Sequence, residues 1–507
     1  MATALPSASD FDHGGAYLRV AVVHYHLRPG GVTRVVQHAV NALAPHGVKL
    51  AVLCGEPPDH DDLPAAMVRV VPELGYEGEE AGGRNGGQDL VAALRRHATE
   101  VLGGRPDLWH FHNPGLGKNL VLPRLIELLA AARERLLIQI HDFAEDGRAE
   151  RYQYLRDGLA PGEGGDLGKC LYPLASHVHY AVLNGRDRRV LRQVGTDESQ
   201  VHVLPNAVWL AGAEATIEPP ACPAPRLFLY PTRAIRRKNL GEFLIWAALA
   251  GADDRFAVTM APRNPAAQAV YSRWVVVAAE LGLPVQFECA KESPLSFAGL
   301  LASATAAVST SVAEGFGLAF LEPWLTGTPL VGRNLPEITR DFDAYQVDLS
   351  HLYNRLMAPL AWIGESRLRR RLGEALTRSR TRYGLPTTEE DVDLALASCT
   401  ADGCVDVGRL DEPMQEDVLR RLATASAAAS EMLPAALPDP VALGAAAERN
   451  RQAVTRGFAL SAYGQRLHDL YQCVAASRAT AAPQAGAARR VVDFFASPER
   501  FCLLRSH

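Results

Sequence analysis

The 507-residue sequence contains no run of 18 apolar residues, which argues against a membrane-spanning helix. Residues 1–16 lack a basic stretch followed by an apolar one, so we expect no secretory signal. Eight cysteines are scattered, and no His or Cys pair near Cys399 and Cys404 completes a zinc-ligand spacing. These absences predict a cytoplasmic protein with reduced thiols and no zinc site.

An excess of positive charge is also missing, because 52 Lys and Arg residues against 57 Asp and Glu residues give a formal net charge of -5. Proteins that coat nucleic acid need a basic surface, so this class is excluded. A small anionic ligand held by a few local cations remains compatible with this charge. The length exceeds what one hydrophobic core supports, so we expect two or three domains.

Strand and helix patterns alternate along two separate stretches. An apolar strand at Leu18–Val23 is followed by a glycine turn, a helical stretch from Arg34 to Ala44 and a second strand at Val48–Leu53, which is a β-α-β unit. Alternation of this kind predicts parallel sheets covered on both faces by helices. Further strands are expected at 108–111, 136–140, 179–183, 201–204, 226–230, 256–260, 285–288, 306–309 and 329–331.

Two changes of pattern divide the chain. A stretch rich in Pro and Ala at 218–225 is predicted to link the two α/β halves. From about 341 to 445 the strand signals fade and charged helical segments dominate, which predicts a helical elaboration. Residues 474–507 are expected to form a tail, with a flexible Ala-rich part at 475–488 and a short apolar piece at 491–504.

The first candidate binding segment is Gly30-Gly31, directly after the first strand. Parallel α/β sheets bind ligands at the carboxyl ends of their strands. Two glycines let the backbone approach a ligand, and the following helix offers unpaired N–H groups. The alternative is a tight turn without a ligand. The spaced three-glycine fingerprint of dinucleotide-binding proteins is absent, which argues against a dehydrogenase.

The second candidate segment is the basic loop from Arg233 to Lys238, which contains four cations in six residues at the end of a strand. Arg side chains can fork onto phosphate oxygens, and Lys acts as a point charge. This composition suits a diphosphate, and a solvated basic loop is the alternative.

The third candidate segment spans residues 311–323 and places two carboxylates, Glu314 and Glu322, around a glycine turn. Gly315 and Gly317 allow backbone N–H groups to face an anion, and a helix expected to start near Leu318 adds its positive end. The carboxylates then lie beside the anion and suit hydroxyls of two different sugars. A carboxylate directly before Gly-Phe-Gly has little structural purpose, so we favour the functional interpretation.

His141 follows the apolar strand at 136–140 and precedes a polar run that would suit the lining of a cleft. A histidine at this place can donate to a ligand oxygen or exchange a proton near neutral pH. A structural histidine with satisfied hydrogen bonds is the alternative, and it is favoured for His24, His26 and His112.

These motifs together resemble those of family-4 retaining glycosyltransferases of the GT-B fold. The spacing from Glu314 to Glu322 around Gly-Phe-Gly-Leu is similar to the motif of that family, and Arg233 with Lys238 resembles its diphosphate-gripping pair. Gly30-Gly31 resembles the glycine loop of the first domain. Leu204–Ala207 is similar to the strand-end signature before the linker, and 462–471 to the helix that returns to the first domain.

The resemblance implies two Rossmann-like domains that face a central cleft, with a role for each motif. Glu314 would contact hydroxyls of the donor hexose and Glu322 the ribose, while Arg233 and Lys238 would stabilise the leaving diphosphate in place of a metal. His141 would lie by the reacting centre and the acceptor. The amides of three residues would face the sugar and phosphate: Phe316, Gly317 and Leu318.

The resemblance also implies a division of the chain. An acceptor-side domain would span 17–217, a nucleotide-sugar domain 226–445 with the elaboration at 341–445, and a closing helix 446–473. Family members usually continue after Leu335–Ile338 with a short glycine-containing loop. This chain continues with Arg340-Asp341-Phe342 and about a hundred helical residues, which would shape an acceptor pocket, mediate oligomerisation or mark a subfamily with another substrate.

We therefore expect a metal-independent, retaining hexosyltransferase that needs no cofactor and uses a nucleotide-sugar donor and a small-molecule or glycan acceptor. UDP-glucose is the default donor, on family frequency alone. Neither nucleic acid nor a membrane is an expected partner, and the sequence assigns no oligomeric state. Two alternatives stay open: a nucleotide-sugar-binding protein without transfer activity, and a nucleotide-sugar epimerase on the same architecture.

Overall fold

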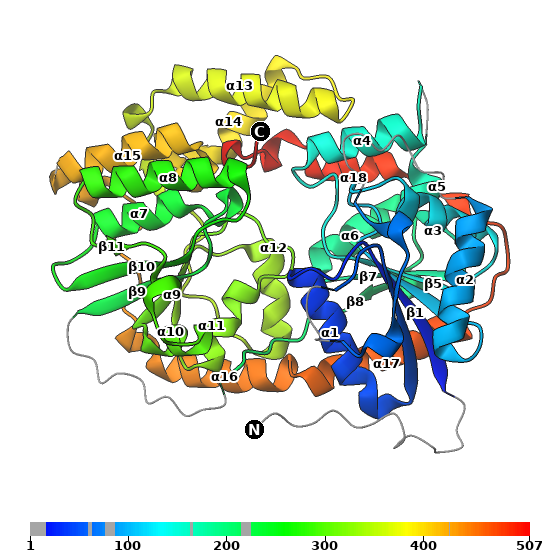
Figure 1. Ribbon diagram of the computed structural model, residues 1–507. Coiled ribbons are helices and arrows are strands. Elements are labelled where there is room, and N and C mark those ends of the chain that lie inside the picture. Colours follow the sequence, from blue (N-terminus) through cyan, green and yellow to red (C-terminus); the bar gives the residue numbers. More distant parts are fainter. Residues whose placement is uncertain are drawn as a thin grey trace.

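The computed structural model describes residues 17–58, 63–76, 87–162, 166–213, 225–424 and 426–506. The expected N-terminal segment 1–16 and all of the expected linker 218–225 except Pro225 lie outside these residues. The described chain folds into two α/β domains that stand side by side (Figure 1). No helix in this part of the chain is long and apolar enough to cross a bilayer.

The N-terminal domain is built on a parallel sheet with the strand order β3-β2-β1-β4-β5-β7-β8 in the described residues. Its strands are β1 (Leu18–His24), β2 (Val48–Cys54), β3 (Val68–Val70), β4 (Leu108–His112), β5 (Leu136–Ile140), β7 (Val178–Val182) and β8 (Val201–Val203). Its helices are α1 (Gly31–Leu43), α2 (Gln88–Leu102), α3 (Val121–Ala131), α4 (Ala149–Leu159), α5 (Gly168–Leu171) and α6 (Gly185–Val194). Every residue of β4, β5 and β7 is buried, because helices cover both faces of the sheet.

The C-terminal domain carries a second parallel sheet, with the order β11-β10-β9-β12-β13 among the described strands. These strands are β9 (Arg226–Arg233), β10 (Asp254–Met260), β11 (Val285–Gln286), β12 (Ala306–Ser309) and β13 (Leu330–Gly332). Its helices are α7 (Leu240–Ala248), α8 (Pro265–Glu280), α9 (Cys289–Glu292), α10 (Phe297–Ser303), α11 (Glu322–Leu325) and α12 (Pro336–Thr339). The repeated β-α-β pattern expected from the sequence is confirmed in both halves.

Each sheet has one point at which the strand order reverses, between β1 and β4 in the first domain and between β9 and β12 in the second. At such a switch point the loops after the two strands diverge and leave a crevice for a ligand. The basic loop 233–238 follows β9, and the glycine turn at 315–317 lies beyond the end of β12. The second and third candidate segments therefore come from the two strands that flank one crevice.

The region 341–445 is helical, as expected, but it also contains a small antiparallel sheet that the sequence did not reveal. Its strands pair in the order β14-β16-β15. The helix α13 reaches across the top of the molecule to the N-terminal domain (Figure 1), where Arg382 forms a 3.0 Å ion pair with Glu150 of α4. The elements are β14 (Met357–Pro359), α13 (Glu365–Arg382), α14 (Glu389–Cys399), β15 (Thr400–Ala401), β16 (Cys404–Asp406) and α15 (Glu412–Thr424).

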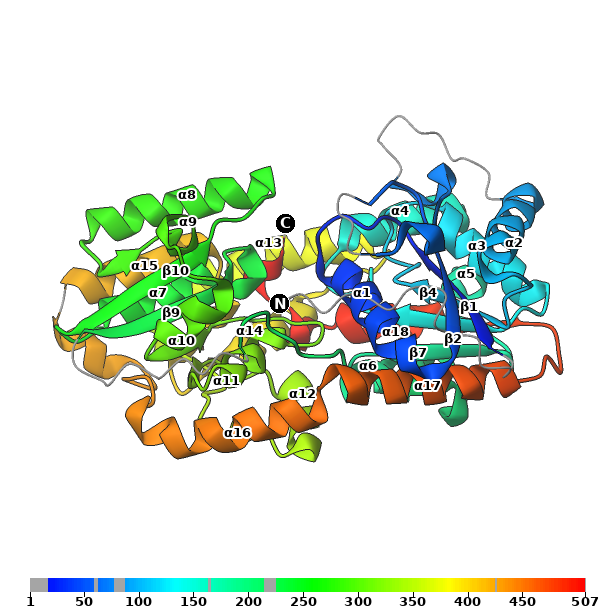
Figure 2. The same cartoon turned by 60° about the horizontal axis from the view of Figure 1, so that its bottom comes forward.

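The expected closing helix at 446–473 is two helices rather than one. Helix α16 (Gly444–Gly457) packs on α11 of the C-terminal domain, and α17 (Leu460–Ala476) packs on α1 of the N-terminal domain. Figure 2 shows them end to end beneath the two domains. The hydroxyl oxygen of Tyr471, in α17, lies 2.8 Å from Nδ1 of the buried His110. The chain therefore returns to its first domain through a buried contact.

The tail expected at 474–507 is described as far as Ser506, and its part at 475–488, expected to be flexible, includes the end of α17, a short strand and the start of a helix. Strand β17 (Gln484–Ala485) pairs with β6 (Pro173–Leu174), and α18 (Ala488–Phe495) packs on α6. The chain then crosses back to the C-terminal domain, where Nη1 of Arg236 donates to the main-chain oxygen of Ser506 at 2.7 Å. Val491 and Val492 are fully buried, so burial of apolar residues explains the order of this segment.

A buried charged cluster fastens the elaboration to the second sheet. Arg333, which follows β13, donates from Nε to Glu242 of α7 at 2.9 Å and from Nη2 to Asp406 of β16 at 2.6 Å. Burial opposes the charge on Arg333, but the two carboxylates outweigh it and raise the pKa of its guanidinium further. The guanidinium satisfies both acids, so neither is left buried without a partner.

We predict that Arg333→Met destabilises the protein by about 3–5 kcal/mol, because the substitution leaves two carboxylates buried without their counter-ion. Urea denaturation of the variant and the wild type measures the loss. Arg367→Met is the matched control, since its ion pair with Asp417 is exposed and its removal should cost less than about 1 kcal/mol. Equal losses in the two variants would contradict the assignment.

Candidate active site

The crevice of the second sheet contains a buried ion-paired cluster built from both flanking loops. Lys238, which ends the basic loop, donates from Nζ to Oε1 of Glu314. Arg237 donates from Nη1 to Oε2 of Glu314 at 3.1 Å and to the main-chain oxygen of Ala313 at 3.0 Å. Both oxygens of Glu314 are therefore held by cations, and the structure brings together two of the residues that the sequence singled out.

The charge state of Glu314 follows from these contacts. Burial alone would raise the pKa of Glu314, but Lys238 and Arg237 outweigh burial and hold this pKa below its ordinary value. Burial lowers the pKa of Lys238, and the carboxylate of Glu314 counteracts this effect. The carboxylate is thus ionised at neutral pH and can accept hydrogen bonds from hydroxyl groups.

Glu322 lies at the interface of the two domains, where it begins α11. Its Oε1 is 3.5 Å from Nη1 of Arg34, which belongs to the first turn of α1. Burial raises the pKa of Glu322 to about 7, although Arg34 and Lys238 act in the opposite direction. The two candidate carboxylates therefore differ, since Glu314 is ionised and Glu322 titrates near neutral pH.

Gly30 and Gly31 lie on the N-terminal side of this interface. Gly30 is the N-cap residue of α1 with an extended backbone, and no side chain caps the first turn of this helix. A Cβ at Gly31 would have no atom within 4 Å, so the space in front of the helix is open. The free N–H groups of α1 consequently face open space beside Arg34.

The two domains touch at the glycine turn itself. A Cβ at position 315 would lie 3.0 Å from the main-chain oxygen of His141, so a side chain there would push the domains apart. Asn184, which caps α6, donates from Nδ2 to the main-chain oxygen of Gly315 at 2.8 Å. Asp341, from the segment that departs from the family pattern, accepts a hydrogen bond from the main-chain N–H of Gly185. His141 is thereby placed next to the Glu314 loop.

The backbone after Gly315 differs from the expected helix. Gly317 has a φ of 93°, a conformation that favours glycine, and residues Leu318–Phe320 form a 3₁₀ turn. The α-helix begins only at Glu322 and has four residues, with Pro323 in its first turn. The expectation of a helix from Leu318 is wrong, because Leu321 leaves the helical conformation. A four-residue helix supplies little dipole, so side-chain cations dominate the electrostatics of the crevice.

Phe316 serves the packing of this turn. It is buried, and its ring contacts those of Phe342 and Phe458 at centroid distances of 5.8 and 6.0 Å. The three rings belong to the turn, to the region after α12 and to the break between α16 and α17. The side chain therefore anchors the turn, and only the main-chain N–H of Phe316 remains as a ligand-binding group.

His141 ends a chain of buried histidines. Its Nε2 is 3.0 Å from Nδ1 of His112, and the rings of His112 and His110 are 4.2 Å apart at their centroids. Burial lowers the pKa of His141 to about 4 and that of His110 to about 3. The histidines are neutral at pH 7. This favours a hydrogen-bonding role for His141 over the exchange of a proton.

The other cations of the basic loop point to different places. Arg236 turns away from Glu314 toward α15 and pairs with Glu412 at 2.7 Å. Arg233 is partly exposed, and burial together with the neighbouring Arg263 lowers its pKa. Among the described residues no hydrogen bond or ion pair joins Arg233 to Lys238 or Glu314. Arg233 thus ends β9, one of the two strands that flank the crevice, and its side chain does not join the cluster.

Sequence reasoning missed several residues of the crevice. Arg34, Asn184 and Asp341 all act across the domain interface, far in the sequence from the residues they contact. Asn184 follows a buried strand and precedes a glycine, which is a recognisable N-cap signal, but this signal does not reveal the contact with Gly315. Arg34 and Asp341 carried no signal.

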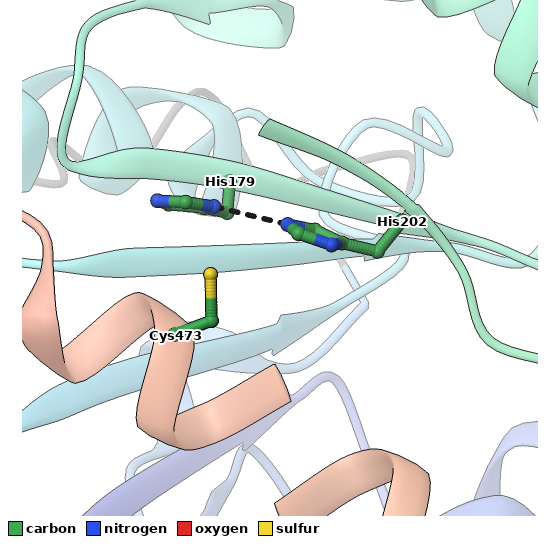
Figure 3. Close-up of side chains that lie close together, drawn as sticks. All are labelled: His179, His202 and Cys473. Carbon is green, nitrogen blue, oxygen red and sulfur yellow. Dashed lines mark hydrogen bonds between the residues drawn. The ribbon is translucent and has the colours of Figure 1, made fainter. Parts of the chain in front are cut away.

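A possible set of metal ligands lies elsewhere. Nδ1 of His179 is 3.0 Å from Nε2 of His202, and the thiol of Cys473 from α17 approaches both rings (Figure 3). Their ligand atoms lie within 4.8 Å of one another, and two imidazoles with a thiolate suit an ion such as Zn²⁺. His179 lies near the amino end of β7, at the opposite edge of the sheet from the crevice. An ion there would not reach Glu314.

Comparisons with known proteins find one family model, which matches part of the N-terminal domain, and one curated relative. Residues 29–211 match the family model described as Glycosyltransferase Family 4. A mannosylglucosyl-3-phosphoglycerate synthase from Petrotoga mobilis is 26% identical over 363 residues, which cover 67% of this chain and 69% of that protein.

Solved structures share the fold across nearly the whole chain. The Anabaena protein Alr3699/HepE, in complex with UDP and glucose, has a TM-score of 0.51 and 12% identity, and the match covers 90% of this chain and 100% of that one. A glycosyltransferase from Rickettsia africae has a TM-score of 0.52 and 11% identity over 90% and 98% of the two chains. The expected GT-B fold is confirmed.

The raised pKa of Glu322 predicts a pH-dependent stability of the ligand-free protein. A buried carboxyl with a pKa near 7 takes up a proton on folding between its unfolded value of 4.5 and about 7. The contribution of Glu322 to the free energy of unfolding is therefore most favourable below pH 4.5 and is lost as the pH rises to about 7. Glu322→Gln removes this dependence.

Between pH 5 and pH 8 we expect the unfolding free energy of the wild type to fall by on the order of 1–3 kcal/mol relative to Glu322→Gln. Urea denaturation of both proteins across this pH range measures the difference, and all other titrating groups cancel in the comparison. A difference that stays constant with pH would show that Glu322 keeps an ordinary pKa.

Proposed function

We propose that this chain, which has the GT-B fold, is a glycosyltransferase of the family-4 type and that it moves a hexosyl group with retention of configuration. The proposed donor is a nucleotide diphosphate sugar, and the acceptor is a hydroxyl group. No metal ion takes part in the proposed reaction, since cationic side chains would stabilise the leaving diphosphate.

One observation carries the proposal, namely the convergence of Lys238, Arg237 and Glu314 at the crevice of the second sheet. An ammonium and a guanidinium suit the oxygens of a diphosphate, and the ionised carboxylate beside them suits the hydroxyls of a hexose. A glycoside hydrolase has no need for such cations beside its acids.

The remaining residues fit around the same ligand. Arg233 extends the cationic edge toward the diphosphate, and Glu322 lies where a second sugar, the ribose, can donate its hydroxyls. The main-chain N–H groups of Phe316, Gly317 and Leu318 line the turn beside Glu314. The open N-terminus of α1, at Gly30 and Gly31, faces the same interface from the other domain.

Transfer with retention breaks the bond between the anomeric carbon and the β-phosphate oxygen and forms a bond to the acceptor oxygen on the same face. The electron pair of the broken bond stays on the diphosphate, and the acceptor proton passes to the departing oxygen. Lys238 stabilises the charge that develops there. His141, neutral and next to the Glu314 loop, orients the donor hexose or the acceptor by a hydrogen bond.

UDP-glucose is the donor that we propose to test first, because HepE was solved with UDP and glucose. A screen of thermal stability against UDP-, GDP- and ADP-sugars identifies the base, since a bound donor stabilises the folded protein. Release of nucleoside diphosphate with each of a set of hydroxyl acceptors then tests transfer. A binding protein would show stabilisation without release, and an epimerase would form product without an acceptor.

We predict that Lys238→Ala lowers the turnover number by about 10²–10³-fold, the usual effect of removing one group that stabilises a developing negative charge. Glu314→Ala should lower turnover as well. Glu322→Ala should mainly raise the KM for the donor, because it removes a contact to the part of the ligand that does not react. Steady-state kinetics with the identified donor measures all three effects.

Lys291→Ala is the control, because Lys291 is an exposed lysine of the same domain that pairs with Glu288 outside the crevice. Its turnover should equal that of the wild type. Normal turnover in folded Lys238→Ala would refute the assignment of Lys238 as the group that stabilises the diphosphate.

A further inference from the structure

A cavity of about 400 Å³ lies between the N-terminal domain and the elaboration. It is lined by α4 and the loops before it on one side, by the end of α13 on the other, and by the C-terminal segment 495–506. In Figure 1 these elements meet at the top of the molecule, where α13 passes over the gap toward α4. The elaboration thus supplies one wall of the cavity.

The lining of this cavity is strongly basic although the whole protein is acidic. Seven of the lining side chains are Lys or Arg, and one, Glu150, is acidic. Five of the cations have carboxylate partners, such as Arg148 with Asp142 at 2.8 Å and Arg505 with Asp146 at 2.6 Å. The side chains of two cations, Lys118 and Arg151, form no hydrogen bond or ion pair with the described residues, which distinguishes them from the other five.

These two cations lie together. Lys118 is half-buried with its Nζ 4.8 Å from the ring centre of Tyr76. Burial lowers the pKa of Lys118, and the neighbouring charges of Arg151 and Arg148 lower it further. Three cations therefore lie close together and repel one another, and only Arg148 of the three has an ion pair among the described residues, with Asp142. An anion that binds between them would relieve this repulsion.

The position of this cluster matches the ligand crevice of the first sheet. Lys118 lies in the loop after β4, at the switch point between β1 and β4, while Arg148 and Arg151 lie at the start of α4, beyond the end of β5. His141 and Asp142 also follow β5, so Arg148 joins the cluster to the residue next to His141. The cluster is thus at the ligand-binding edge of the acceptor-side domain.

A second cavity of about 370 Å³ adjoins the basic cavity. Glu314 lines the second cavity, and four residues line both cavities: Phe495, Arg500, Cys502 and Arg505. The basic cavity therefore lies next to the cavity that Glu314 lines. The C-terminal segment forms the shared wall.

We propose that the acceptor carries a phosphate or carboxylate group, which docks in the basic cavity on Lys118 and Arg151 while its hydroxyl points toward the Glu314 crevice. This inference rests on the proposed glycosyl transfer and adds the chemical class of the acceptor. Lys118 and Arg151 bind the anion. Arg148, which is held by its ion pair with Asp142, lies beside them and helps to orient the anion. The elaboration at 341–445 then closes the acceptor pocket, which is one of the roles that the sequence suggested for it.

Binding of an anion is tested without turnover by isothermal titration calorimetry in the presence of saturating UDP, which occupies the cations of the donor crevice. The probes are 3-phosphoglycerate, glycerate and inorganic phosphate. Comparison of the first two separates the contribution of phosphate from that of carboxylate. We expect 3-phosphoglycerate to bind the wild type and to bind Lys118→Ala/Arg151→Ala at least tenfold more weakly.

Kinetics with the full chain tests the same idea in the reaction. The acceptors are matched pairs with and without phosphate: glucose 6-phosphate and glucose, and glucosyl-3-phosphoglycerate and glucosylglycerate. We expect the phosphorylated member of each pair to have the higher kcat/KM and the double variant to raise its KM by about 10–100-fold, as expected for the loss of two charge-assisted contacts. Lys169→Ala, an exposed lysine of the same domain, is the control and should behave as the wild type.

The outcomes separate this inference from the proposed function. Turnover that is equal with neutral and anionic acceptors, or calorimetry in which the double variant binds 3-phosphoglycerate as tightly as the wild type does, overturns the anionic site and leaves glycosyl transfer in place. Failure of every nucleotide sugar to bind overturns the proposed function instead. Failure of 3-phosphoglycerate to bind while UDP binds also overturns the anionic site.

Discussion

The buried contact between Lys238 and Glu314 is the interaction on which the crevice of the second sheet depends. It joins the two loops that leave β9 and β12, so it spans the crevice of the second sheet. The pair is costly to bury, and Arg237 helps to offset the cost by occupying the second oxygen of the carboxylate. These side chains are already ordered by their contacts with one another. A ligand whose phosphate and hydroxyl groups replace some of these contacts therefore binds without a large cost of ordering them.

Several connections between the two domains hold them in their arrangement. The break between α16 and α17, the C-terminal segment and the ion pair of α13 with α4 all connect the two domains. At the centre of the interface, a Cβ at Gly315 would collide with the backbone of His141. Packing at this point therefore limits how closely the domains approach and sets the distance between the two ligand crevices.

The electrostatics of the cleft contrast with those of the whole chain. A net charge of -5 is spread over the molecule, while cations gather at the carboxyl edges of both sheets. At the donor crevice they accompany carboxylates, which suits a ligand with phosphates and hydroxyls. At the basic cavity the side chains of Lys118 and Arg151 have no such partners among the described residues, which suits an anion. The two sides of one cleft are therefore specialised by charge.

The sequence by itself determined the local features of this protein. Apolar runs such as that of β5 predicted buried parallel strands, and the spacing around Glu314 predicted a glycine turn with two carboxylates, because both patterns depend on neighbours in the chain. It also marked Lys238 as a cation at a strand end. The continuous helix from Leu318 was predicted wrongly, since propensity does not reveal the turn that Leu321 and Phe316 adopt in their packed surroundings.

Only the tertiary structure decided which distant residues share a site. The contact of Lys238 with Glu314, the approach of Arg34 to Glu322 and the gathering of Lys118 with Arg151 join positions that are dozens to hundreds of residues apart. The order of the C-terminal segment has the same origin, because Val491 and Val492 are buried by helices from another part of the chain. Such contacts depend on how whole elements pack, and no local pattern encodes them.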